Sequence, residues 1–160
     1  QQMPFISEKI PTFEEFANAS IEEIYGEEIV DAYERKVTSF ESIILINKGE
    51  NKFEIEKLPP LAQSIPILTS ETYDINEDGY EDVIVGGNIY NTEVETPRLD
   101  NQFALLLISD KNKNYSAIGP DKSGLYLSGN TKSLKIIDRK NPKLLVANNN
   151  SNLEVFELNK

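Results

Sequence analysis

The chain contains no cysteine and no histidine among its 160 residues. Their absence excludes disulfides, zinc fingers, haem ligation by histidine and every catalytic arrangement that uses a thiol or an imidazole. Because few enzyme classes remain after this exclusion, we expect the chain not to be an enzyme. The lack of cysteine indicates no compartment, since secreted proteins held together by calcium or by a large core need no disulfides.

Basic side chains are scarce as well. The sequence has 16 of them against 27 acidic ones, so its formal net charge is -11. The resulting field repels phosphate backbones, and we therefore expect no nucleic acid partner. The acidic residues are spread along the chain, which is typical of a solvated surface rather than of a cation-binding tail.

Long hydrophobic runs are also missing. No apolar stretch approaches the roughly 20 residues that span a bilayer, so we expect no membrane insertion. Residues 1–8 lack the charged-then-apolar plan of a signal peptide, which favours a mature or trimmed segment. The hydrophobic content of 39% allows a modest core, and the length suits one domain or a fragment of a larger one.

The first 38 residues are expected to form a helical segment that precedes the remainder. Two capping-box patterns occur in it, at Thr12 with Glu15 and at Ser20 with Glu23. Each is followed by apolar residues at helical spacing, which predicts two short helices within residues 12–37 that break near Asn18.

Residues 39–160 show short β-branched runs separated by Gly, Asn, Asp and Pro, a pattern typical of antiparallel strands. Two hairpins are predicted, at Ser42–Ile46 with Lys52–Glu56 and at Leu105–Ile108 with Tyr115–Ile118. Aligning them indicates an internal repeat of roughly 60 residues, whose units must stack to bury both sheet faces. About ten strand-like runs make two to three four-stranded blades, fewer than closed propellers use. The expected fold class is mainly β, with antiparallel blades of an incomplete propeller.

The strongest local pattern is the acidic stretch Asp74–Asp82, with oxygen-bearing side chains at its first, third, fifth and ninth positions. Ca²⁺ takes about six to eight oxygen ligands, and a tight loop supplies them from alternate residues. Gly79 permits the sharp turn. The predicted ligands are the side chains of Asp74, Asn76, Asp78 and Asp82 and the main-chain carbonyl of Tyr80. An EF-hand would carry Glu where Val85 stands, so we expect strands rather than helices beside the loop.

A metal-free turn is the alternative for this stretch, because Asp and Asn favour turns through their own side-chain hydrogen bonds. Three crowded carboxylates repel one another, however, unless a cation neutralises them. We therefore expect Ca²⁺ as the cofactor.

A long polar loop over residues 92–102 is the expected partner-binding segment, since loops on rigid sheets carry function. Its candidate residues are Glu93, Glu95, Arg98 and Asp100. The acidic residues also allow an alternative function, a carbohydrate-active hydrolase or lyase-like domain, which needs two carboxyl groups at a set separation. Arg98 is read more simply as part of an ion pair that orders the loop.

The motif Asp-x-Asn-x-Asp-Gly-x-x-Asp before a strand resembles the loop of FG-GAP and VCBS repeats, which form the blades of integrin-α-type propellers. Two further stretches, 42–49 and 87–90, resemble the bacterial ASPIC/UnbV group, related to cartilage acidic protein, and the likeness extends over about residues 40–158. It implies the C-terminal portion of a longer secreted or cell-surface protein, in bacteria one associated with the outer membrane. The resemblance also implies bound calcium and a role in adhesion through a protein or glycan ligand. It implies contact with further blades or self-association as well. The turns at 110–114 and 138–143 lack the full ligand set, so we expect one calcium site.

Overall fold

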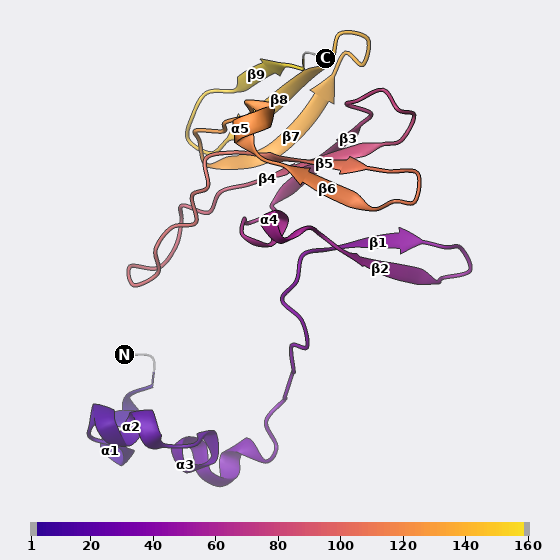
Figure 1. The fold of residues 1–160 in the computed structure, drawn as a ribbon. Helices are drawn as coiled ribbons and strands as arrows, with labels where there is room; N and C mark the ends of the chain where they lie inside the picture. The colour runs from indigo at the N-terminus through magenta and orange to yellow at the C-terminus, as the bar shows by residue number, and fades with distance from the viewer. Residues whose placement is uncertain (1–2, 159–160) are drawn as a thin grey trace. The chain divides into compact units, whose positions relative to one another are not determined.

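A computed structural model describes residues 3–158. The chain divides into two compact units, Gln1–Phe40 and Glu41–Lys160 (Figure 1). The division falls close to the predicted end of the helical segment at residue 38.

The first unit consists of short helices. They are α1 (Pro4–Lys9), α2 (Phe13–Asn18), α3 (Ile21–Tyr25) and the 3-10 helix η1 (Gly26–Ile29). Both predicted capping boxes are present: Thr12 Oγ1 accepts from the Glu15 amide at 3.2 Å, and the Thr12 amide donates to the Glu15 carboxylate at 3.3 Å. Ser20 and Glu23 make the same pair of bonds before α3. Helix α1, which begins with proline at its first position, was not predicted.

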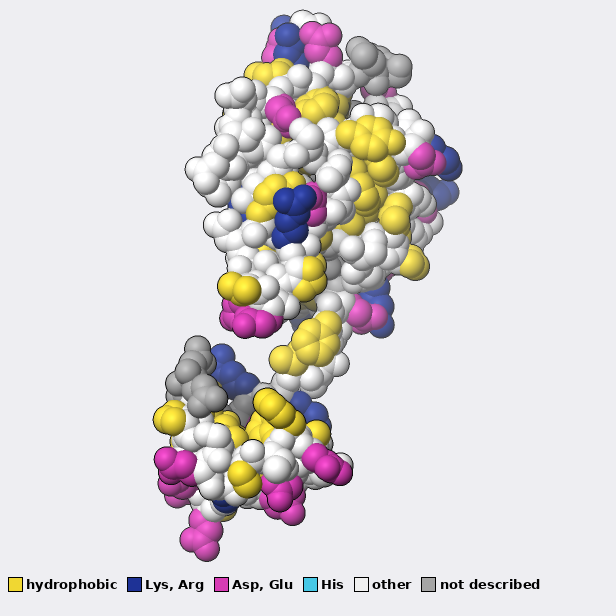
Figure 2. All heavy atoms as spheres, turned by 90° about the vertical axis from the view of Figure 1, so that its left-hand side faces the viewer, with side chains coloured by type: hydrophobic (Ala, Val, Ile, Leu, Met, Phe, Trp, Pro, Cys, Tyr) yellow, Lys and Arg dark blue, Asp and Glu magenta, His cyan; other side chains and the backbone are white. Residues whose placement is uncertain are grey.

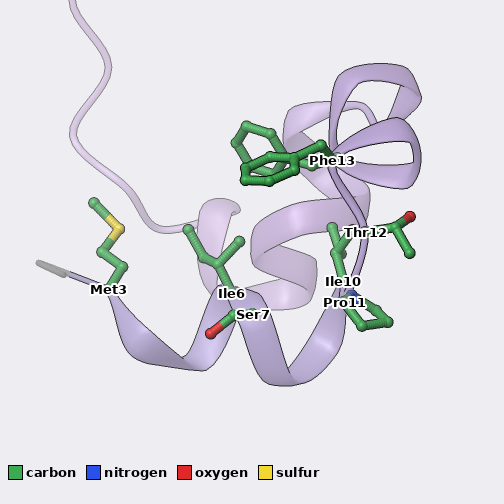
Figure 3. Close-up of a pocket in the computed structure, with 8 residues that line it drawn as sticks. Met3, Ile6, Ser7, Ile10, Pro11, Thr12 and Phe13 are labelled. Atoms are coloured by element: carbon green, nitrogen blue, oxygen red, sulfur yellow. The ribbon is translucent and has the colours of Figure 1, made fainter.

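No residue in the helices of this unit is buried. The side chains of Met3, Ile6 and Ile10 lie on one side of α1, with Phe13 beside them, around a hollow of about 480 Å³ (Figure 3). Phe13 remains 95% exposed. Hydrophobic side chains are exposed on the face of this unit seen in Figure 2, with acidic side chains around them.

The second unit contains the nine strands of the described residues, joined by two one-turn helices. The strands are β1 (Ile43–Asn47), β2 (Phe53–Lys57), β3 (Thr69–Tyr73), β4 (Asp82–Gly86), β5 (Leu105–Ser109), β6 (Tyr115–Ile118), β7 (Thr131–Ile137), β8 (Lys143–Asn148) and β9 (Glu154–Glu157), and the helices are α4 (Pro60–Gln63) and α5 (Pro120–Ser123). The same order of elements occurs twice, as hairpin, proline-initiated helix and two further strands.

The sheets do not follow that order of elements. Strands β1 and β2 form a hairpin sheet, β3 to β6 a four-stranded central sheet, and β7 to β9 a three-stranded C-terminal sheet, all antiparallel. The central sheet thus joins β3 and β4, which end the first run of this order, to β5 and β6, which begin the second. The C-terminal sheet likewise joins β7 and β8 to β9, which follows them. The mainly β fold class with a short N-terminal helical segment is confirmed, and no sheet of the described residues closes into a barrel.

Both faces of the central sheet are covered, because successive side chains of a strand point to opposite faces. Ile84 packs in a cluster with Leu144 and Val146 of the C-terminal sheet. Val83 and Val85 lie in a second cluster that includes Leu58 and Ala62, around α4, with Ile44 of the hairpin packed against it. The central sheet therefore lies between the hairpin sheet and the C-terminal sheet (Figure 1).

Polar contacts join the central and C-terminal sheets along β3 and β7. The Leu134 amide donates to Thr69 Oγ1 at 3.0 Å, and Lys135 Nζ pairs with the Glu71 carboxylate at 2.9 Å. At the end of β4, the Asn88 amide donates to the Thr131 carbonyl. These bonds fix the β3–β4 pair against β7.

The predicted strand positions need small corrections. Strands β1 and β2 each begin and end one residue later than expected, since the turn is closed by the Lys48 amide donating to the Lys52 carbonyl. The expected number of strands was ten. No helix of the described residues is long and apolar enough to cross a membrane.

Gly87 is a position where only glycine fits. Its φ is +150°, and a Cβ there would lie 2.7 Å from the Leu68 Cβ and 2.9 Å from the Leu68 amide nitrogen. We expect Gly87→Ala to lower the free energy of unfolding by about 1–3 kcal/mol, as overpacking does. Gly86→Ala, whose Cβ would meet its nearest neighbour at 3.4 Å, should change it by less than about 1 kcal/mol. Urea denaturation of both variants measures the difference, and equal losses would contradict the steric argument.

Candidate metal site

The acidic stretch forms the bend between β3 and β4, which end and begin at Tyr73 and Asp82. It is therefore flanked by strands. Gly79 has φ +89° with open space around it, and Glu77 has φ +57°. Two residues with positive φ within three positions let the chain reverse tightly, which turns the polar side chains of the bend inward on one another.

The tip of the bend is held by side-chain oxygens. The Asp78 amide lies 3.1 Å from both Asp74 Oδ1 and Asn76 Oδ1, so two acceptors converge on one donor. Asp74 Oδ2 accepts from the Gly79 amide at 3.0 Å. Asp78 Oδ1 accepts from the Tyr80 amide at 2.9 Å, and its other oxygen from the Asn76 side-chain amide. The structure thus brings together three of the predicted ligand side chains, those of Asp74, Asn76 and Asp78.

Asp82 occupies a different environment at the base of the bend. Its side chain is fully buried. One carboxylate oxygen accepts from the Ile75 amide at 2.9 Å and the other from the Ser109 amide at 2.8 Å. Ser109 Oγ in turn donates to the Glu81 carbonyl. Asp82 therefore ties the start of the bend to the end of β5, a structural role that the sequence did not reveal.

Tyr80, predicted to contribute its carbonyl, has an exposed side chain at the surface of the bend. Within residues 3–158, no three His, Cys, Asp or Glu side chains are grouped closely enough to hold a metal ion. The set nevertheless suits calcium in its chemistry, because every candidate donor atom is an oxygen. Each carboxylate offers about four acceptor positions, and those of Asp74 and Asp78 use two apiece.

The turn at 110–114, after β5, can be compared with the bend at 74–82. It was expected to bind no calcium. Asp110 accepts from the amides of Asn112 and Asn114 at 2.7 and 2.9 Å and from the Asn114 side chain at 2.9 Å. These hydrogen bonds, the Asn114 side-chain bond foremost, lower the pKa of Asp110 below its usual value. The turn is closed by its own hydrogen bonds around one carboxylate.

The polar loop at 92–102 is ordered by a cluster of one aromatic and two charged side chains. Arg98 pairs with Asp100 at 2.8 Å and its guanidinium lies 4.7 Å from the centre of the Tyr90 ring. The Tyr90 hydroxyl donates to Asp100 at 3.0 Å. Burial, and then the hydrogen bond to Asp100, raise the pKa of Tyr90. Tyr90 was not singled out for this loop, and only its proximity in sequence to Arg98 hinted at the contact.

The remaining predicted residues of this loop, Glu93 and Glu95, are exposed at its tip beside Val94, which is fully exposed. A backbone bond from Thr96 to the Glu93 carbonyl and one from the Thr92 hydroxyl to the Thr96 carbonyl close that tip. The structure thus separates the four predicted residues into two groups. Arg98 and Asp100 order the loop, while the two glutamates face solvent.

Comparison with known protein families, with curated proteins and with solved structures finds no match to this chain.

Proposed function

We propose that the second unit is a calcium-binding β-repeat module that provides structural support or binds a protein or glycan partner. The observation that carries the proposal is the bend at 74–82. Oxygen atoms of Asp74 and Asn76 converge there on one amide, between two strands of a sheet whose faces are both covered. A cation at this bend would neutralise the carboxylates and fix the hairpin β3–β4, which lies against the C-terminal sheet.

The proposal extends to family and location. A calcium bend between antiparallel strands, in a unit whose element order recurs, is compatible with an FG-GAP/VCBS-type repeat of a secreted or cell-surface protein. The ordered loop at 92–102 supplies the binding surface, because Arg98, Asp100 and Tyr90 fix its base and leave Glu93 and Glu95 exposed.

Calorimetric titration tests the metal directly. Protein freed of divalent ions should bind one Ca²⁺ per chain, and Asp78→Ala should abolish the binding because it removes a carboxylate from the tip of the bend. Asp110→Ala, in the turn that its own hydrogen bonds close, should still bind one. Heat of binding that persists in Asp78→Ala, or is absent in the unaltered chain, would defeat the proposal.

A further inference from the structure

Strand β1 has an edge that no described strand pairs with. Within residues 3–158 it pairs with β2 alone. The Leu58 amide donates to the Ser42 carbonyl and the Lys48 amide to the Lys52 carbonyl, which fixes the alternation of the ladder. The intervening residues Ile43, Leu45 and Asn47 therefore direct their N–H and C=O groups away from β2. Such an edge is a template for a further strand.

The hairpin also has an uncovered apolar face. Four hydrophobic side chains point to that face and are 41–62% exposed: Ile43, Leu45, Phe53 and Ile55. Beside the hairpin, a hollow of about 530 Å³ extends over Thr72, Val83 and Val85 of the central sheet. An isolated two-stranded hairpin is marginally stable, and this one has an unpaired edge and only partly fills the space beside the central sheet.

The central sheet shows which kind of element can pair with the edge of β1. Its hairpin β5–β6 corresponds to β1–β2 in the order of elements, and the edge of β5 is covered by β4, with Val83 opposite Leu107 and Val85 opposite Leu105. The β3–β4 pair in turn covers the face of the C-terminal sheet at Leu144. The occupant that suits the edge of β1 is therefore a strand pair like β3–β4 or β7–β8.

In the C-terminal sheet, β7 and β8 form a strand pair of this kind. Strand β9 lies beside β8 as β5 lies beside β4, with Leu145 opposite Val155 and Ile84 opposite Leu106. Strand β9 has four residues and contributes one core contact, Phe156, whereas β1 has five residues and is almost wholly apolar. Strand β1 would make the same ladder with β8 and bring a second strand, β2, with it.

We propose that the chain self-associates head to tail, with β1 of one copy replacing β9 beside β8 of a second copy. The sheet so formed has four strands, β7 and β8 from one copy and β1 and β2 from the other. Following the register of the central sheet, Ile44 lies opposite Leu145 of the second copy and Leu45 opposite its Leu144. Strands β7 and β8 of the second copy then fill the hollow beside Thr72, Val83 and Val85 of the first copy. Contacts of this kind are heterologous, so they make rings or open chains.

Sedimentation of the full chain tests the proposal with two matched variants. Leu45 and Ile55 are directly opposite each other, on the same face, and each directs its N–H to a free edge, one of β1 and the other of β2. Proline removes that donor and is tolerated at sheet edges. The unaltered chain should show a mass above 18.1 kDa that rises with concentration. Leu45→Pro should weaken the association at least tenfold, and Ile55→Pro should leave it unchanged. A monomeric unaltered chain, or equal losses in both variants, would overturn the proposal.

Crosslinking supplies a second test that depends less on the folding of the proline variants. Because the chain has no cysteine, Ile44→Cys with Leu145→Cys introduces the only thiols. Ile44 packs on one side of the central sheet and Leu145 belongs to the sheet on the other side, so a bridge must join two copies. Mild oxidation should give covalent oligomers from this pair and few from Ile55→Cys with Leu145→Cys. Equal yields, or no oligomers from the first pair, would contradict the register.

Discussion

Millimolar Ca²⁺ is expected to raise the melting temperature of the chain by roughly 5–10 °C relative to the same protein in chelator. An ion that binds only the folded state at a hundredfold excess over its dissociation constant adds about 2.7 kcal/mol. For a chain of this size, each kcal/mol shifts the melting temperature by about 2–4 °C. Differential scanning calorimetry in Ca²⁺ and in EDTA, at equal ionic strength, measures the shift.

Two variants of the bend show whether the shift arises there. Asp78→Ala removes a carboxylate that accepts from Tyr80 and Asn76, and its melting temperature should no longer respond to calcium. Glu77→Gln removes the same charge one residue earlier, from a side chain expected to point outward, and should keep the full response. A melting curve of the unaltered chain that is identical in calcium and in EDTA would remove the basis for the metal.

Asp82→Ala is expected to be the most damaging single substitution of the bend. It leaves the amides of Ile75 and Ser109 without their acceptor at a fully buried site. Hydrogen bonds to charged groups contribute about 1.5–3 kcal/mol each, so the loss should be roughly 3–6 kcal/mol in the free energy of unfolding. Denaturant unfolding in the presence of EDTA measures this loss separately from any effect of calcium.

The neighbouring Glu81 is the matched control for Asp82. Its side chain is 57% exposed and pairs with Arg139 at 3.5 Å, so Glu81→Ala should change the stability by no more than about 0.5 kcal/mol. Asp82→Asn keeps one acceptor oxygen and should fall between the two. If Asp82→Ala were as mild as Glu81→Ala, the carboxylate would not be the link between the bend and β5.

Local patterns predicted much of this structure. The capping boxes at Thr12 and Ser20 formed because their hydrogen bonds join residues three positions apart. The hairpins and the β3–β4 bend followed from turn residues for the same reason. Helix α1 was missed because its first turn carries no capping side chain and begins only with proline.

Features that depend on distant residues were not predictable from a single sequence. The burial of Asp82 requires the Ser109 amide, 27 positions further along the chain. The pairing of β4 with β5 spans the whole polar loop, so nothing local indicates it. The same limit applies to the predicted partner-binding acids at 93–100, where the contact of Asp100 with Tyr90 separates Asp100 from the two glutamates.

The mismatch between the recurring order of elements and the sheets bears on how this protein can be divided. A fragment that begins with β1 and stops after β4 contains one whole stretch of that order, yet it holds the hairpin sheet and only half of the central sheet. A fragment from β3 to β6 contains a complete sheet instead. The recurring order of elements and the sheets are therefore offset by one strand pair, and the boundaries of an expressed fragment should follow the sheets.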